Sequence, residues 1–296
     1  MGTISLQGRS ILGLEDFKAE EIERVLDVAA QMKRIVLSGN KKKDYLKGKS
    51  IVTVFSEAST RTRSSFELAG KYWGADVVNI TKSGSSMPKG ESLRDTLLTV
   101  SAMGTDVVII RNSSEGAALF ASKVKSPKGK TPLIFNAGDG AHEHPSQTLL
   151  ELFTLREAGK KIKEMKYAII GDILHSRVAR SDIYGFTKLG AEVHLTGPRT
   201  LVPKKLEAMG AIVDDKLEDA LKDSNQFLFL RTTNSELRIR GNNNSIRQWC
   251  AWEIGNFYTK HKEEKYYTSF YDKTEPRNDI LDTFRPMREV VLGEIR

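Results

Sequence analysis

The chain has 296 residues, of which 39% are hydrophobic and 28% are charged, and its formal net charge is +8. This length and composition allow a sizeable core and predict two domains. No apolar run approaches the roughly 20 residues that a membrane-spanning helix needs, and no N-terminal signal pattern is present, so we expect a cytoplasmic protein without a membrane partner. A single cysteine, Cys250, excludes an intrachain disulfide and a Cys-based zinc cluster.

Helical and strand patterns alternate along the chain. Apolar residues recur at helical spacing over 17–36, after a possible N-cap at Asp16. Short β-branched or apolar runs then follow, most of them separated by helical patterns, at 51–55, 75–80, 106–110, 132–135, 167–170, 192–195, 211–213 and 227–230. Continuous apolar strands between helices predict parallel sheets covered on both faces. We therefore expect an α/β fold with two doubly wound domains, each with a mainly parallel sheet flanked by helices.

The boundary between the two domains is expected at mid-chain. The sequence predicts a helix over 145–157 with Pro145 at its first position, where proline is favoured, and this helix could connect the two halves. We therefore place the domains at 1–147 and 148–296.

The segment 59–63, S-T-R-T-R, directly follows the strand predicted at 51–55 and would begin a helix. Backbone N–H groups and the positive end of the helix dipole favour an anion at that position, and hydroxyls with Arg61 add donors. A phosphate is the natural ligand. For an isolated motif of this kind the alternative is that Ser59 only caps the helix while Arg61 and Arg63 lie on a solvated surface.

Other polar residues also follow predicted strands. The segment 136–147, NAGDGAHEHPSQ, brings His144 and Gln147 to the start of a helix, and Arg111 and Arg231 each follow a strand directly. In open α/β sheets, ligands bind at the carboxyl ends of the strands. Taken singly, either arginine would more often be an ordinary surface residue and His144 could merely cap a helix. The polar, glycine-rich loop 83–92 has the composition of a lid.

Together, in this order, these motifs resemble the transcarbamoylase family, and most closely the catalytic chains of aspartate carbamoyltransferases, over about residues 10–231. The resemblance implies transfer of the carbamoyl group from carbamoyl phosphate to L-aspartate, giving N-carbamoyl-L-aspartate and phosphate in pyrimidine biosynthesis. It implies that the first domain binds carbamoyl phosphate and the second binds the amino acid. It also implies a homotrimer with active sites between subunits, with regulatory or dihydroorotase chains as possible further partners, and neither a cofactor nor a metal.

The resemblance also assigns roles to individual residues. Arg61, Thr62 and His144 would be catalytic, because they would stabilise charge on the carbamoyl oxygen. The full set is Ser59, Thr60, Arg61, Thr62 and Arg111 for the phosphate, His144 and Gln147 for the carbamoyl group, Arg177 and Arg231 for the carboxylates of aspartate, and Ser85 and Lys89 for a lid from the neighbouring subunit.

The C-terminal quarter departs from the family pattern. Thr233 stands where the family has the glutamine of R-x-Q, the segment 273–279, KTEPRND, stands in place of H-P-x-P, and the family's usual final helix is not expected before Arg296. Two alternatives therefore remain beside aspartate carbamoyltransferase: an enzyme that uses another amine, and a catalytically weak homologue that acts as a phosphate-ligand-binding or assembly protein.

Ornithine transcarbamoylase fits worse, because its H-C-L-P and D-x-x-x-S-M-G elements are missing. We expect no nucleic acid partner, because the basic runs at 41–43 and 160–166 lack interleaved aromatic residues.

Overall fold

The structure is a computed structural model that describes residues 5–81, 90–126, 131–224, 226–230 and 268–271. Its internal contacts divide the chain into two compact units. Unit 1 comprises Met1–Lys160 with Arg177–Leu189, and unit 2 comprises Lys161–Ser176 with Gly190–Arg296. Each unit has its own sheet, and each is described separately below.

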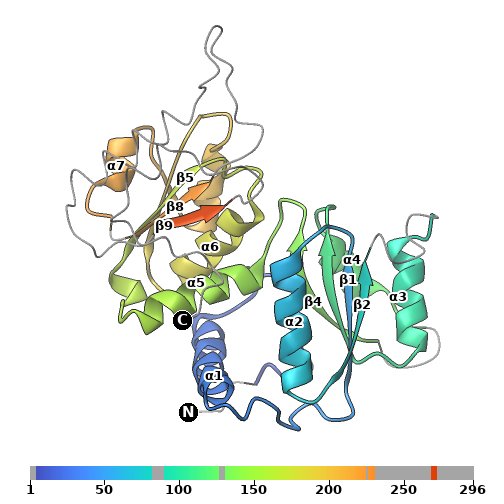
Figure 1. Ribbon diagram of the computed structural model, residues 1–296. Helices are drawn as coiled ribbons and strands as arrows, with labels where there is room; N and C mark the ends of the chain where they lie inside the picture. Colours follow the sequence, from blue (N-terminus) through green and yellow to red (C-terminus); the bar gives the residue numbers. More distant parts are fainter. Residues whose placement is uncertain (1–4, 82–89, 127–130, 225, 231–267, 272–296) are drawn as a thin grey trace, which may run out of the picture. The chain divides into compact units, whose positions relative to one another are not determined.

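Unit 1 contains a four-stranded parallel sheet in the order β2-β1-β3-β4 (Figure 1). Its strands are β1 (Ser50–Phe55), β2 (Asp76–Thr81), β3 (Val107–Asn112) and β4 (Leu133–Asp139). Its helices are α1 (Ala19–Leu37), α2 (Thr60–Tyr72), α3 (Leu93–Ala102), α4 (Ala117–Lys123), α5 (Pro145–Glu157) and α6 (Arg177–Lys188).

Both faces of the central strand β1 are buried. Val52 and Val54 of β1 belong to an apolar cluster that also takes residues from α3 and α4. The alternate residues Ile51 and Phe55 belong to a second cluster, against which Phe66 of α2 packs. Because successive strand side chains point to opposite faces, helices on both sides require the continuous apolar runs that the sequence contains.

Unit 2 contains a five-stranded parallel sheet in the order β7-β6-β5-β8-β9. Its elements are β5 (Lys166–Gly171), β6 (Glu192–Thr196), β7 (Ile212–Val213), β8 (Gln226–Leu230), β9 (Thr268–Tyr271), α7 (Leu217–Leu221) and two 3-10 helices, Ile162–Glu164 and Lys204–Met209. The expected fold class, parallel sheets flanked by helices, is confirmed.

The element boundaries agree with most of the expectations and correct a few. Each predicted strand is present, whereas β9 was not predicted. The first helix begins at Ala19 rather than after Asp16, because the Lys18 N–H donates to Glu21 Oε2 at 2.8 Å and so closes the first turn there.

The compact units differ from the division expected at residue 147. Helix α5 packs against α1, β4 and α6, so both α5 and α6 belong to unit 1, and the contacts divide at residue 160 instead. The assignment of carbamoyl phosphate to the first domain and the amino acid to the second stays a prediction. None of the helices in the described ranges combines the length and the apolarity needed to cross a bilayer.

Close packing between α5 and α6 depends on Gly185. A Cβ atom at this position would lie 2.5 Å from Thr148 Cγ2 and 3.2 Å from Leu14 Cδ1. We expect Gly185→Ala to lower the free energy of unfolding by about 1–3 kcal/mol, the usual cost of overpacking a core. Denaturant unfolding measures it. Thr148→Ser, which removes the obstructing methyl group and keeps the hydroxyl that donates to Asp182, should recover part of that loss in the double variant; no recovery would contradict the packing explanation.

Candidate active site

The polar residues expected at strand ends meet at the carboxyl edge of the sheet in unit 1. Phe55, the last residue of β1, is in register with Arg111 of β3, and the Ser56 N–H donates to the Arg111 carbonyl at 3.0 Å. The hydroxyl-rich segment 59–62 therefore begins a few residues beyond this pairing. Since all four strands are parallel, the loop after β4, which leads to His144, lies at the same edge.

The start of α2 has the features of an anion site. The helix begins at Thr60 with Ser59 as its N-cap residue, and, within the part of the chain that the structure describes, the Ser59 hydroxyl makes no capping hydrogen bond. This geometry does not support the alternative that Ser59 serves only as a cap. Ser59 and Thr62 are partly buried, while Thr60 and Arg61 are exposed. The first N–H groups of a helix lack intrahelical acceptors, so they can bind an anion together with these side chains.

Two arginines share one carboxylate beside this helix. Glu57 Oε2 lies 2.9 Å from Arg177 Nη2 and 3.4 Å from Arg111 Nε. Arg111 Nη1 also donates to the Ala137 carbonyl at 3.0 Å. A side chain at residue 138 would meet both guanidinium groups within 3.2 Å, so Gly138, whose φ is +114°, lets them approach. The Glu57 carboxylate is therefore shared by two guanidinium groups that lie close together.

Glu57 was missed by the sequence reasoning, although it lies two residues before Ser59. Two partly buried arginines need an acidic partner close to them. A search for a carboxylate near the end of the same strand could therefore have found Glu57. Arg177, which the resemblance assigns to the amino acid, lies in unit 1 with Arg111 and Glu57.

His144 completes the cluster as a neutral imidazole. It is the N-cap residue of α5, it is buried, and its Nε2 lies 3.3 Å from Arg111 Nη1. Burial, followed by the charges of Arg111 and Arg177, lowers the pKa of His144 to about 3. Because arginine can only donate, Nε2 accepts this hydrogen bond, and Nδ1 then carries the proton and donates to Ser146 Oγ at 3.3 Å.

The structure does not bring every expected residue to this cluster. The Gln147 side chain donates to Glu151 Oε1 at 3.0 Å, one turn further along α5. Ser85, Lys89 and Arg231 lie outside the described residues. The roles that the resemblance assigns to these four residues stay predictions.

The shared carboxylate is expected to hold both guanidinium groups in place. Glu57→Gln removes the charge of this residue and leaves only one oxygen to accept from the guanidinium groups of Arg111 and Arg177. Charge-assisted hydrogen bonds are roughly twice as strong as neutral ones, so we expect kcat to fall by about 10-fold. Initial rates of phosphate release measure it. Glu67→Gln is the matched control, because Glu67 pairs with Lys71 within α2 and not with either arginine. An equal effect of the two variants would contradict the role of Glu57.

The protein is therefore an α/β protein with donor groups and positive charge gathered at the edge of a parallel sheet. Such an arrangement is suited to a phosphate-bearing ligand. The family model of the aspartate/ornithine carbamoyltransferase carbamoyl-P binding domain matches residues 9–157. The aspartate carbamoyltransferase catalytic subunit of Pelotomaculum thermopropionicum is 53% identical over 229 residues, which are 77% of this chain and 72% of that protein. The chain therefore belongs to the aspartate/ornithine carbamoyltransferase family.

Solved structures agree with this assignment. Aspartate transcarbamoylase from Trypanosoma cruzi, in complex with carbamoyl aspartate and phosphate, matches with a TM-score of 0.74 and 26% identity, over 96% of this chain and 91% of that chain. The catalytic subunit of M. Jannaschii aspartate transcarbamoylase matches with a TM-score of 0.71 and 32% identity, over 93% of this chain and 90% of that chain.

Proposed function

We propose that the protein is the catalytic chain of an aspartate carbamoyltransferase, which transfers the carbamoyl group of carbamoyl phosphate to the amine of L-aspartate in pyrimidine biosynthesis. The observation that carries this proposal is the meeting of Arg111, His144 and the start of α2 at one sheet edge. Relatives at about half identity are named aspartate carbamoyltransferase catalytic subunits.

The phosphate group of the substrate binds at the start of α2. Backbone N–H groups and the hydroxyls of Ser59, Thr60 and Thr62 donate to its oxygens, and Arg61 and Arg111 neutralise its charge. A bound phosphate competes with Glu57 for the guanidinium of Arg111, because both anions need the same donors. Binding is therefore an exchange of one anion for another around Arg111.

The carbamoyl group is polarised by His144, together with Arg61 and Thr62. The neutral amine attacks the carbamoyl carbon, and negative charge builds on the carbonyl oxygen. The carbonyl then re-forms as the bond to the phosphate oxygen breaks, and the proton lost by the amine nitrogen leaves with the phosphate. Each well-placed donor to such an oxygen contributes roughly 3 kcal/mol to transition-state stabilisation. The Ser146 hydroxyl can accept from His144 Nδ1 or donate to it, so the neutral ring can carry its proton on Nε2 once phosphate takes the Arg111 donor.

The amino acid is bound by arginines. Two guanidinium groups suit the two carboxylates of aspartate, because each can pair bidentately, and we assign this role to Arg177 and Arg231. Gln147 contacts the carbamoyl group, and Ser85 and Lys89 reach the site from a neighbouring subunit. These assignments rest on the family resemblance, and for Arg177 also on its contact with Glu57 beside Arg111.

We further propose a homotrimer in the cytoplasm, with regulatory or dihydroorotase chains as possible additional partners. The edge strand β2 exposes 57% of Val78, and nearby Leu68 of α2 is 46% exposed, which favours self-association of unit 1. The single cysteine suits a reducing compartment. Light scattering that gives the mass of one 33.1 kDa chain in solution would contradict the trimer.

A panel of amines tests the proposed function. Purified protein receives carbamoyl phosphate and, separately, aspartate, ornithine or other amines, while released phosphate is measured, with Arg61→Ala as the blank. We expect turnover with aspartate that disappears in the blank. Turnover with a different amine alone would identify another acceptor, and binding of carbamoyl phosphate without turnover of any amine would indicate a binding or assembly protein.

A further inference from the structure

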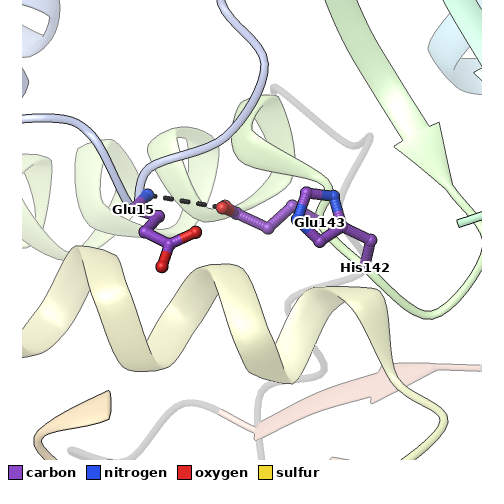
Figure 2. Close-up of side chains that lie close together, drawn as sticks. All are labelled: Glu15, His142 and Glu143. Atoms are coloured by element: carbon purple, nitrogen blue, oxygen red, sulfur yellow. Dashed lines mark hydrogen bonds between the residues drawn. The ribbon is translucent and has the colours of Figure 1, made fainter. Parts of the chain in front are cut away.

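Glu143, the residue before His144, is a buried carboxylate that the mechanism above does not use. Its side chain is 1% exposed, and its Oε2 accepts a hydrogen bond from the Leu14 N–H at 2.7 Å. Its Oε1 accepts from the Glu15 N–H at 3.3 Å, as Figure 2 shows. The carboxylate is thereby fixed to the segment that precedes α1, which is far away in the sequence.

Ser181 of α6 links this carboxylate back to the catalytic histidine. The Ser181 hydroxyl donates to Glu143 Oε2 at 2.8 Å. Ser181 Oγ in turn accepts a hydrogen bond from the His144 N–H at 2.8 Å. The His144 N–H can only donate, so the Ser181 hydroxyl hydrogen points to Glu143 Oε2, which accepts it. The acceptor on Glu143 therefore orients the hydroxyl that holds the backbone of His144.

The position of Glu143 leaves no room for a larger residue at Gly13. A Cβ atom there would lie 2.1 Å from Glu143 Oε1. Glu15, His142 and Glu143 do place three possible metal-ligand atoms within 4.8 Å of one another. Both Glu143 oxygens already accept hydrogen bonds from N–H or O–H donors, however, so the contacts point to an internal hydrogen-bonding role rather than to a cation site.

We propose that Glu143 is a positioning residue for the carbamoyl transfer, and that it acts through Ser181 to fix His144 opposite Arg111. His144 is the N-cap residue of α5, so its backbone position determines where its ring lies relative to the carbamoyl oxygen. A displacement of about 1 Å in a catalytic group can cost on the order of 100-fold in rate. The four hydrogen bonds around Glu143 and Ser181 hold His144 against such a displacement.

Four variants test this inference, which rests on the proposed function. Glu143→Ala removes the acceptor, and we expect kcat per folded site to fall roughly 10- to 100-fold, with a much smaller change in the KM for carbamoyl phosphate. Glu143→Gln keeps one acceptor oxygen for Leu14 and Ser181, so it should recover most of this loss. Ser181→Ala should lower kcat in the same way, and the double variant with Glu143→Ala should be no worse than Glu143→Ala alone.

Asp182→Asn is the matched control. Asp182 lies on α6, as Ser181 does, and its buried carboxylate accepts a hydrogen bond from the Thr148 hydroxyl. It should lower the melting temperature and leave kcat per folded site unchanged. A readout independent of activity comes from ¹⁵N-histidine labelling: the backbone amide signal of His144, which donates to Ser181 Oγ, should shift in Ser181→Ala but not in Asp182→Asn.

The results separate the inference from the proposed function. Absence of turnover in the unmodified chain would contradict the function, while the shift of the His144 amide would still support the linkage. An unchanged kcat in both Glu143→Ala and Ser181→Ala, or equal kcat loss in Glu143→Gln and Glu143→Ala, would overturn the positioning role.

Discussion

Replacing Arg111 with alanine is expected to lower kcat/KM for carbamoyl phosphate by about 1,000-fold, since loss of one preorganised donor commonly costs 100- to 1,000-fold and here a charge is lost with it. Arg111 is the centre of the cluster: it contacts Glu57, the Ala137 carbonyl and His144 Nε2. Its loss removes a phosphate donor and leaves the Glu57 carboxylate with fewer partners, so anion binding and the order of the cluster both suffer. Initial rates of phosphate release over a range of carbamoyl phosphate concentrations measure the effect.

Arg156→Ala provides the control for this experiment. Arg156 also lies in unit 1, but its side chain is 37% exposed and its guanidinium pairs with Asp27 and Glu23 on α1. Exposed ion pairs of this kind contribute about 0–1 kcal/mol to stability, so turnover should remain near that of the unmodified chain. An Arg111→Ala variant that is folded and loses less than about 10-fold would contradict the proposed phosphate site, given the cost expected for one donor.

His144→Asn is expected to lower kcat by about 100-fold, the effect of losing a donor to a developing oxyanion. The unmodified chain should show no change in kcat near pH 6.5 that depends on this histidine. Burial and the two arginines oppose its protonation, so with a pKa of about 3 the ring stays neutral from neutral pH down to well below pH 5. Rates from pH 5 to 9 for both proteins, with the exposed His175→Asn as the control, measure this.

The same depressed pKa also predicts how stability depends on pH. In the unfolded chain the ring titrates near pH 6.5, so between about pH 6.5 and pH 3 the unfolded state binds more protons than the native state. The contribution of His144 to stability is therefore complete above pH 6.5 and is lost as the pH falls towards 3. His144→Asn should remove this part of the acid destabilisation. A kcat that falls with a midpoint near pH 6.5 in the unmodified chain and not in the variant would contradict a neutral histidine.

The sequence predicted the sheets better than the domain boundary. Continuous apolar runs such as 51–55 are specific for parallel strands buried on both faces, and the structure buries β1 in that way. The strand β9 was missed because a four-residue segment carries little periodicity of its own. The division of the chain into the two compact units could not be predicted from the local sequence pattern. It depends on the packing of α5 against α6, and these helices are separated in the sequence by β5.

The candidate site was predictable where a motif and a strand end coincide. Arg111 and His144 were expected at the same edge, and the structure places their side chains 3.3 Å apart. The residues that hold them were missed, because Glu57 and Glu143 act through contacts with α6 and with the segment before α1. Such contacts depend on tertiary packing, and no spacing within the local sequence indicates them.

Transfer of a labelled carbamoyl group tests the central claim most directly. The full chain receives ¹³C-labelled carbamoyl phosphate and L-aspartate, and the products are identified by mass spectrometry, with Arg111→Ala as the comparison. The proposed function predicts that the label appears in N-carbamoyl-L-aspartate together with an equal amount of phosphate, and that this product is lost in the variant. Label found only in the spontaneous breakdown products of carbamoyl phosphate would contradict it.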